Sequence, residues 1–162
     1  MPHDAHAGKP SRLPTPEETE AIGLVPLLSP YMRQASAQMP GALRAAFDAH
    51  GLTARHGAVL PRLLAEEPLT VSELAARLGL SLSTVSELVG ALNRAGLVDR
   101  REDPANRRRT LLSLTPEHRP LVEQFIAARS APLLRALDSL SPRDRAGFIA
   151  GLTAWAREAA RS

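Results

Sequence analysis

Apolar residues recur at helical spacing along most of the chain, and the segments they define predict a mainly α protein. The clearest of them is VSELAARL, at residues 71–78. Thr70 and Glu73 fit a capping box, and Leu69 and Leu74 stand at the positions of a hydrophobic staple. Gly79 can end the helix in the left-handed conformation. Both ends of this short helix are therefore predicted.

The following segment, LSTVSELVGALNRAG, predicts a helix with two different faces. Ser81 is placed to cap it and Gly96 to end it. At about 100° per residue, one arc of the helix collects its large apolar residues, Val85, Leu88, Val89 and Leu92. The opposite arc carries small and polar residues. Because only a short turn joins this helix to the one before it, the pair predicts a helix-turn-helix.

Two short strands are predicted next, at 97–101 and 110–115, with residues 102–109 as the loop of a hairpin. This loop holds three consecutive arginines, at 107–109. Between positions 94 and 109 there are six arginines and three acidic residues, a balance of 6 − 3 = +3, which equals the formal net charge of the whole chain. The densest positive charge thus adjoins the helix-turn-helix, and such clustering is more informative than the net charge.

Helices are predicted on both sides of this region. A helix is expected from Pro30 to about residue 50, with a kink at Pro40 and a stop at Gly51. Another lies within 52–68, where Pro61 predicts a bend. Residues 1–18 are rich in proline, histidine and charge and lack periodicity, which predicts a mobile arm.

Two further helices are predicted at the C-terminal end. Thr115 and Pro116 are placed to start a helix that runs to about residue 137. Ser141 and Pro142 repeat this start signal for a last helix that ends near residue 160.

Composition narrows the functional classes. Aromatic residues make up only 3% of the 162 residues, which argues against a large aromatic-lined catalytic cavity. The absence of cysteine excludes disulfides, thiolate metal sites and thiol redox switches. No clustered histidines and carboxylates predict a metal site, and no cofactor is expected. No apolar stretch approaches the ~20 residues that span a bilayer, so a cytoplasmic protein without membrane association is expected.

The small polar face of helix 81–96 is suited to the major groove of duplex DNA. Small side chains let the helix approach base edges closely, and hydroxyl groups bind bases or phosphates. The candidate DNA-binding residues of this helix are Ser83, Thr84, Ser86, Glu87, Gly90 and Arg94. Glu87 could accept a hydrogen bond from a cytosine amino group or could repel phosphate.

The hairpin supplies the other candidates, because guanidinium groups reach into narrow minor grooves with high negative potential. They are Asn106, Arg107, Arg108 and Arg109. The alternative interpretation, without DNA binding, is that these residues form a charged loop that keeps the protein soluble.

Two other classes compete with DNA binding. Enzymatic activity is disfavoured because the chain has no nucleophile elbow, P-loop, zinc-protease motif or glycine-rich dinucleotide turn. A winged-helix module that binds only other proteins is the stronger alternative. The arginine-rich hairpin favours DNA, since a protein interface would more often expose aromatic residues.

From about residue 27 to residue 125 the chain resembles the MarR family of winged-helix regulators. The matching segments are HGLTARHGAVLPRLL, LTVSELAARLGLSLSTVSELVGALNRAGLV and DPANRRRTLLSLTPEHRPLVE. The resemblance implies a winged helix-turn-helix domain with a two-strand wing at 52–115. It also implies dimerisation regions at 19–51 and 116–162, so that the protein acts as a homodimer on a roughly palindromic operator, commonly as a repressor.

The resemblance also assigns individual residues. Arg108 matches the wing arginine that enters the minor groove, and Asn106 replaces its usual acidic partner. Family members often respond to a phenolic or other anionic small molecule bound between the dimer region and the winged helix. In this sequence that crevice is expected near Tyr31, Arg44, His50 and His56.

Overall fold

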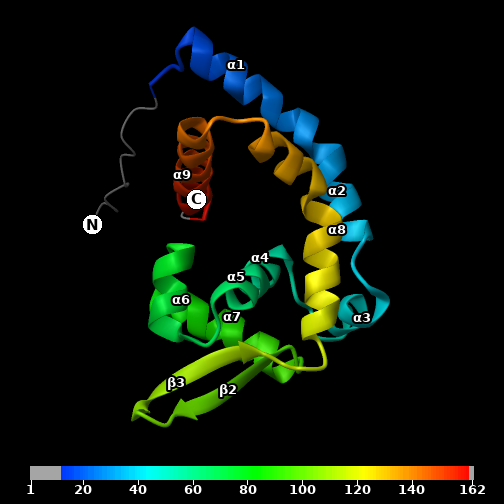
Figure 1. The fold of residues 1–162 in the computed structure, drawn as a ribbon, viewed down its shortest axis with the longest axis vertical. Coiled ribbons are helices and arrows are strands. Elements are labelled where there is room, and N and C mark those ends of the chain that lie inside the picture. The colour runs from blue at the N-terminus through cyan, green and yellow to red at the C-terminus, as the bar shows by residue number, and fades with distance from the viewer. Residues whose placement is uncertain (1–11, 161–162) are drawn as a thin grey trace, which may run out of the picture. The chain divides into compact units, whose positions relative to one another are not determined.

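The computed structural model describes residues 12–160, with the backbone alone at positions 35 and 36. It divides into two compact units, one up to Ala37 and one from Gln38 onward. Helices dominate both units, and a small antiparallel sheet lies in the second (Figure 1). The predicted mainly α fold with a winged helix-turn-helix is confirmed.

The first unit contains α1 (Pro16–Leu24), the 3-10 helix η1 (Val25–Leu28) and α2 (Ser29–Ala37). The predicted arm at 1–18 is wrong at its C-terminal end, because α1 already begins at Pro16. Thr15 and Glu18 form a capping box there, in which the Thr15 N–H donates to the Glu18 carboxylate over 2.8 Å. Residues 1–11 of the predicted arm lie outside the described residues.

The prediction of one kinked helix from Pro30 to about residue 50, within the N-terminal region 19–51, is also wrong. The chain forms α2 and then a separate helix, α3 (Gly41–Ala49). Pro40 lies between them with an extended ψ of 141°. A proline disfavours helical conformation in the residue before it and offers no N–H to the preceding turn, so a break replaces the expected kink. Gly51 follows α3 with a φ of 60°, as expected of a helix stop.

The helix predicted within 52–68 is two helices, α4 (Ala54–Gly57) and α5 (Val59–Glu66). Ala58 lies between them, and Pro61 is the third residue of α5. The first four N–H groups of a helix have no partner within it, so proline removes no hydrogen bond at this position. The bend expected at Pro61 is therefore replaced by a helix boundary upstream of it.

The helix-turn-helix is formed by α6 (Val71–Leu78) and α7 (Leu82–Arg94), with the predicted caps. The Thr70 hydroxyl accepts from the Glu73 N–H over 3.2 Å, and the Glu73 carboxylate accepts from the Thr70 N–H over 2.8 Å. Gly79 ends α6 with a φ of 67°, and the Ser81 hydroxyl accepts from the Thr84 N–H over 3.1 Å to cap α7. These interactions between residues close in sequence determine where α6 and α7 begin and where α6 ends.

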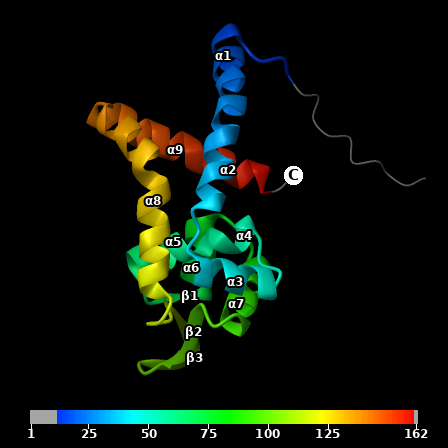
Figure 2. The ribbon, with the colours of Figure 1, turned by 90° about the vertical axis from the view of Figure 1, so that its right-hand side faces the viewer.

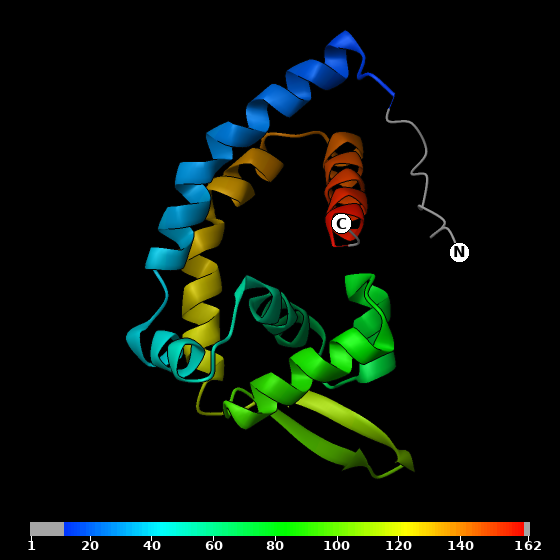
Figure 3. The ribbon, with the colours of Figure 1, turned by 180° about the vertical axis from the view of Figure 1, so that it is seen from behind.

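Three strands form one antiparallel sheet in the order β1-β3-β2. They are β1 (Leu69–Thr70), which was not predicted, β2 (Val98–Asp103) and β3 (Asn106–Leu114). The predicted loop at 102–109 is wrong, because only residues 104 and 105 form the turn and the arginines at 107–109 belong to β3. Asp103 stabilises this tight turn by accepting from the Ala105 N–H over 2.9 Å. Seen from behind, the β2–β3 hairpin, the wing, extends beside α7 (Figure 3).

One hydrophobic core joins the sheet to α3, α5, α6 and α7. The four apolar residues predicted for the inner face of α7 are all buried in it, namely Val85, Leu88, Val89 and Leu92. Leu112 and Leu114 of β3 are buried in the same core, which anchors the base of the wing against the helices. The core thus fixes which face of α7 is turned outward.

The last two helices are α8 (Arg119–Asp138) and α9 (Pro142–Ala159), and α8 rises from the end of the sheet (Figure 2). The start of α8 differs from the predicted Pro116. The Thr115 hydroxyl donates to the Gly96 carbonyl over 2.9 Å, and the chain makes a turn before the helix begins. Ser141 caps α9 as predicted, with its hydroxyl accepting from the Asp144 N–H over 3.2 Å.

Glu67 connects α8 to the sheet. Its carboxylate accepts from the Leu114 N–H of β3 over 2.7 Å. It also forms an ion pair with Arg119, the first residue of α8. Since Glu67 is half-buried, one carboxylate holds the end of the wing and the beginning of α8 together.

Candidate nucleic-acid interface

The outer face of α7 carries the helix residues predicted to contact DNA. Ser83, Ser86, Glu87 and Arg94 are exposed, and Thr84 and Gly90 are half-buried. The hydroxyl oxygens of Ser83 and Thr84 lie 3.0 and 2.8 Å from that of Ser81. The first turn of α7 therefore presents a cluster of three hydroxyl groups, which can bind bases or phosphates.

Gly90 keeps this face low. Apart from the neighbouring residues and the backbone of α7 itself, a Cβ atom at Gly90 would contact only the Arg94 guanidinium, at 3.4 Å. The Arg94 side chain thus folds back over the glycine, one turn earlier in the helix. At its centre, the surface between Glu87 and Arg94 is therefore covered only by the movable end of the Arg94 side chain.

The wing presents its arginines on two sides, because neighbouring side chains of a strand point to opposite faces. Arg108 shares a face of β3 with Thr110 and the buried Leu112, whereas Arg107 and Arg109 lie on the other face. All three arginines are exposed.

Asn106 acts on the backbone of the wing. Its side-chain oxygen accepts from the Arg108 backbone N–H over 3.1 Å. Asn106 therefore orders the chain directly after the turn and leaves the Arg108 side chain available.

Arg109 is held by two acidic side chains. Its guanidinium lies 3.6 Å from the carboxylate of Glu73 and 3.9 Å from that of Asp103. The hydrogen bond from the Thr70 N–H is the main cause that lowers the pKa of Glu73, and the charge of Arg109 adds to it. Glu73 is thus ionised at neutral pH and positioned to hold Arg109 beside α6.

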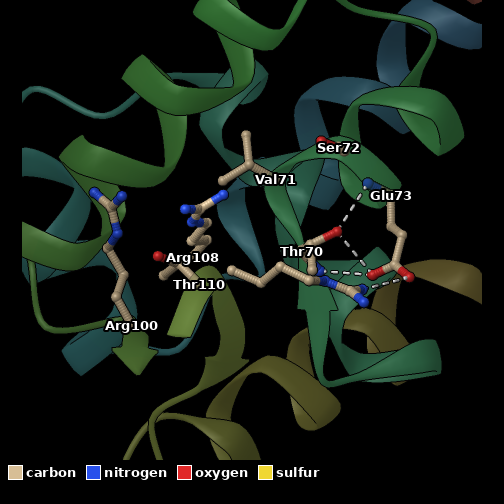
Figure 4. A pocket seen from close by; sticks show the side chains of 8 residues that line it. Thr70, Val71, Ser72, Glu73, Arg100, Arg108 and Thr110 are labelled. Carbon is tan, nitrogen blue, oxygen red and sulfur yellow. Dashed lines mark hydrogen bonds and ion pairs between the residues drawn. The ribbon is translucent and has the colours of Figure 1, made fainter. Parts of the chain in front are cut away.

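Arg100 and Arg108 line a hollow between the wing and the start of α6, and the Arg108 side chain lies between Arg100 and Val71 (Figure 4). The residues that line the hollow are Thr70, Val71, Ser72, Glu73, Arg100, Arg108, Arg109 and Thr110. Within residues 12–160, neither Arg100 nor Arg108 has an ion-pair partner. Two guanidinium groups without ion-pair partners in the lining of one hollow attract anions.

Sequence reasoning missed Arg100. Its partner across the hairpin is Leu112, so the alternation of β2 places it on the same face as Arg108. The strand was predicted, but its pairing register depends on the turn, which was predicted too long.

The four positions expected near an effector lie on or at the end of three helices, α2, α3 and α4. Arg44 is exposed on α3, and His50 is exposed at the end of that helix. His56 is half-buried in α4, where its Nδ1 accepts from the Thr53 N–H over 3.0 Å. Burial lowers the pKa of His56, with Arg55 as a secondary cause. Tyr31 belongs to α2 in the first unit.

In the part of the chain that the structure describes, no group of three or more histidine, aspartate or glutamate residues could hold a metal ion. No helix of residues 12–160 is long and apolar enough to cross a membrane.

Comparison with known proteins places this geometry in a family. A model of the MarR family matches residues 50–109, which include the helix-turn-helix and most of the wing. The structure is similar to that of the PcaV transcriptional regulator of Streptomyces coelicolor in complex with its natural ligand. It shares 25% sequence identity with PcaV, with a TM-score of 0.57 over 92% of this chain and 99% of that one. The winged helix-turn-helix of this chain is of the MarR type.

Two further proteins resemble the chain. A mutant of S. aureus MepR, in a structure bound to an oligodeoxyribonucleotide, is 26% identical with a TM-score of 0.52, over 83% of this chain and 94% of MepR. YsmB of Bacillus subtilis, described as an uncharacterised HTH-type transcriptional regulator, is 30% identical over 49% of this chain and 55% of its own length. The chain therefore spans little more than half the length of this curated relative in the match.

Proposed function

We propose that this chain is a sequence-specific regulator of transcription that binds double-stranded DNA as a homodimer. The outer face of α7 would enter the major groove, and the wing would follow the adjacent minor groove with Arg107 and Arg108. The observation that carries this proposal is the juxtaposition of a low, hydroxyl-rich helix face with exposed arginines on the neighbouring hairpin. The MepR mutant, which resembles this chain, is bound to an oligodeoxyribonucleotide in its structure.

Charge supports the assignment of the wing. Arg107 and Arg108 are exposed, and neither forms an ion pair within the described residues. A planar, permanently charged guanidinium suits a narrow minor groove, where the negative potential is enhanced. We include Arg100 with these residues as a contact to the phosphate backbone, since it lies beside Arg108 at the hollow.

Exposed apolar surface supports the homodimer. One face of α9 presents Phe148, Ile149, Leu152 and Trp155, which are 44–53% exposed. In the first unit, Ile22, Leu24, Leu27 and Leu28 are more than half exposed. Contiguous apolar surface of this kind marks a binding surface in soluble proteins. A second copy of the chain would cover it, and two α7 helices would then face two half-sites of a near-palindromic operator.

Control by a small molecule is part of the proposal. PcaV, which resembles this chain over most of its length, was crystallised with its natural ligand. We propose that a phenolic or other anionic effector binds in the second unit, near Arg44, His50 and His56, and releases a repressor from its operator. Titration of phenolic acids into the protein–DNA complex tests this step, and release by none of them would contradict it.

Selection of bound fragments from random duplex DNA tests the function. The expected result is a half-site sequence repeated with two-fold symmetry, with an affinity that falls steeply as salt rises, because phosphate contacts release counterions. The alternative of a protein-binding winged helix predicts no enrichment and no such salt dependence. The relatives named above are regulators, a class without catalytic chemistry, and no enzymatic activity is expected.

A further inference from the structure

Glu87 is the one acidic residue of α7 (Leu82–Arg94), and it lies in the middle of the face proposed to meet DNA. It is exposed, and within residues 12–160 its carboxylate has neither a hydrogen bond nor an ion pair. The residues three and four positions away in the helix are Ser83, Thr84, Gly90 and Ala91, none of which is basic. No group of the described residues therefore binds the Glu87 carboxylate, which leaves it available to DNA.

A carboxylate at this position is unfavourable against the DNA backbone. Like charges repel each other, so a phosphate close to the Glu87 carboxylate would weaken binding. The phosphates border the groove, and the base edges form its floor. Low neighbours on either side, Ser83 and Gly90, let this part of α7 approach that floor. The favourable partner for Glu87 is thus a base.

The chemistry of the carboxylate selects among the bases. An ionised carboxylate only accepts hydrogen bonds. In the major groove, guanine offers two acceptors, thymine an acceptor and a methyl group, and adenine an amino donor next to the acceptor N7. Cytosine alone offers an amino donor with no acceptor of its own beside it.

We propose that Glu87 is a specificity-determining residue that selects a C·G base pair in each half-site by accepting a hydrogen bond from the cytosine amino group. This inference rests on the proposed function and adds the identity of one base pair to it. In this role the negative charge of Glu87 also disfavours sequences that present an acceptor at this position.

Fragment selection with three proteins tests the inference: the unaltered chain, Glu87→Gln and Glu87→Ala. A glutamine pairs with N6 and N7 of adenine, so Glu87→Gln should replace cytosine by adenine at one position of each half-site and leave the other positions unchanged. Glu87→Ala should lose the preference at that position alone. Binding of synthetic duplexes should show about a tenfold preference for cytosine with the unaltered chain and for adenine with Glu87→Gln.

Glu117→Gln is the matched control, since it removes the same charge from an exposed position just before α8. Its selected sequence should be that of the unaltered chain. Unchanged selected sequences in all variants, or a uniform gain in affinity for any DNA on loss of Glu87, would overturn the inference and leave the proposed function standing. Failure of the unaltered chain to enrich any sequence would instead overturn the proposed function.

Discussion

The guanidinium of Arg109 lies 3.6 Å from the carboxylate of Glu73, and this contact links the wing to the N-terminal cap of α6. Glu73 uses its other carboxylate oxygen to accept from Thr70. The wing therefore rests on a residue that the helix-turn-helix has already fixed. Of two adjacent arginines, Arg109 is engaged within the protein, and Arg108 has no ion-pair partner among the described residues.

This difference predicts two kinds of mutant. Arg108→Ala should weaken operator binding by about tenfold or more and lower the slope of log affinity against log salt by about 0.9, because one phosphate-neutralising charge is lost. Arg109→Ala should cost at most about fivefold, the value of an exposed ion pair, with an unchanged slope. Fluorescence anisotropy over a salt series measures both quantities. Equal slopes for the two mutants would contradict the separate roles.

Gly90 should separate folding from DNA binding. Gly90→Ala should raise the free energy of unfolding by about 0.5–1 kcal/mol, since glycine weakens a helix interior and the added Cβ meets only the movable end of Arg94. Gly90→Glu should remain folded and lose operator binding, because a bulky anion would occupy the low centre of the α7 face. Urea denaturation and gel-shift assays test the two outcomes. Normal binding by Gly90→Glu would show that this face does not meet DNA.

The apolar face of α9 predicts the oligomeric state. The unaltered protein should sediment as a dimer at micromolar concentration, and the double mutant Leu152→Asp/Trp155→Asp should sediment as a monomer, because two desolvated carboxylates are costly. Both residues are about half exposed in the isolated chain, so folding of the mutant should be retained, which circular dichroism checks. Arg143→Ala, an exposed change at the start of the same helix, serves as the control. A monomeric unaltered protein would contradict the prediction.

His56 predicts a pH dependence of stability. Its folded-state pKa is lowered, so the folded protein binds fewer protons than the unfolded chain as pH falls below the ordinary value of 6.5. The contribution of His56 to the free energy of unfolding is complete above pH 6.5. It is lost as pH falls through the lower folded-state pKa, because a protonated Nδ1 cannot accept from the Thr53 N–H. Loss of such a cap costs about 1 kcal/mol. His56→Gln keeps an acceptor without titrating, and urea denaturation between pH 7.5 and pH 5 should show a smaller decline for it.

The sequence predicted the helix-turn-helix well because its determinants are local. Thr70, Gly79, Ser81 and Gly96 mark helix ends through interactions with residues a few positions away. The apolar arc of α7 predicted its buried face for the same reason. These elements carry six of the residues proposed to meet DNA, so most of that surface was predictable.

The wing was predicted less well because its outer half lies beyond the core. Arg107, Arg108 and Arg109 are exposed on both faces of β3, so no alternation of apolar and polar residues marks the strand. The ion pair of Arg109 with Glu73 joins residues far apart in the sequence, and no local pattern encodes it. The two-residue strand β1 was missed because its pairing with Leu111 and Leu112 is likewise long-range.

The carboxylate of Glu67 binds both the backbone of β3 and Arg119, and so couples the position of the hairpin to that of α8. In a dimer joined through its terminal helices, a change in the tilt of α8 would carry each hairpin with it. The distance between the two winged helix-turn-helix domains would then depend on the angle between the two α8 helices. A molecule that alters this angle could change the fit to the operator without touching a single DNA-contacting residue.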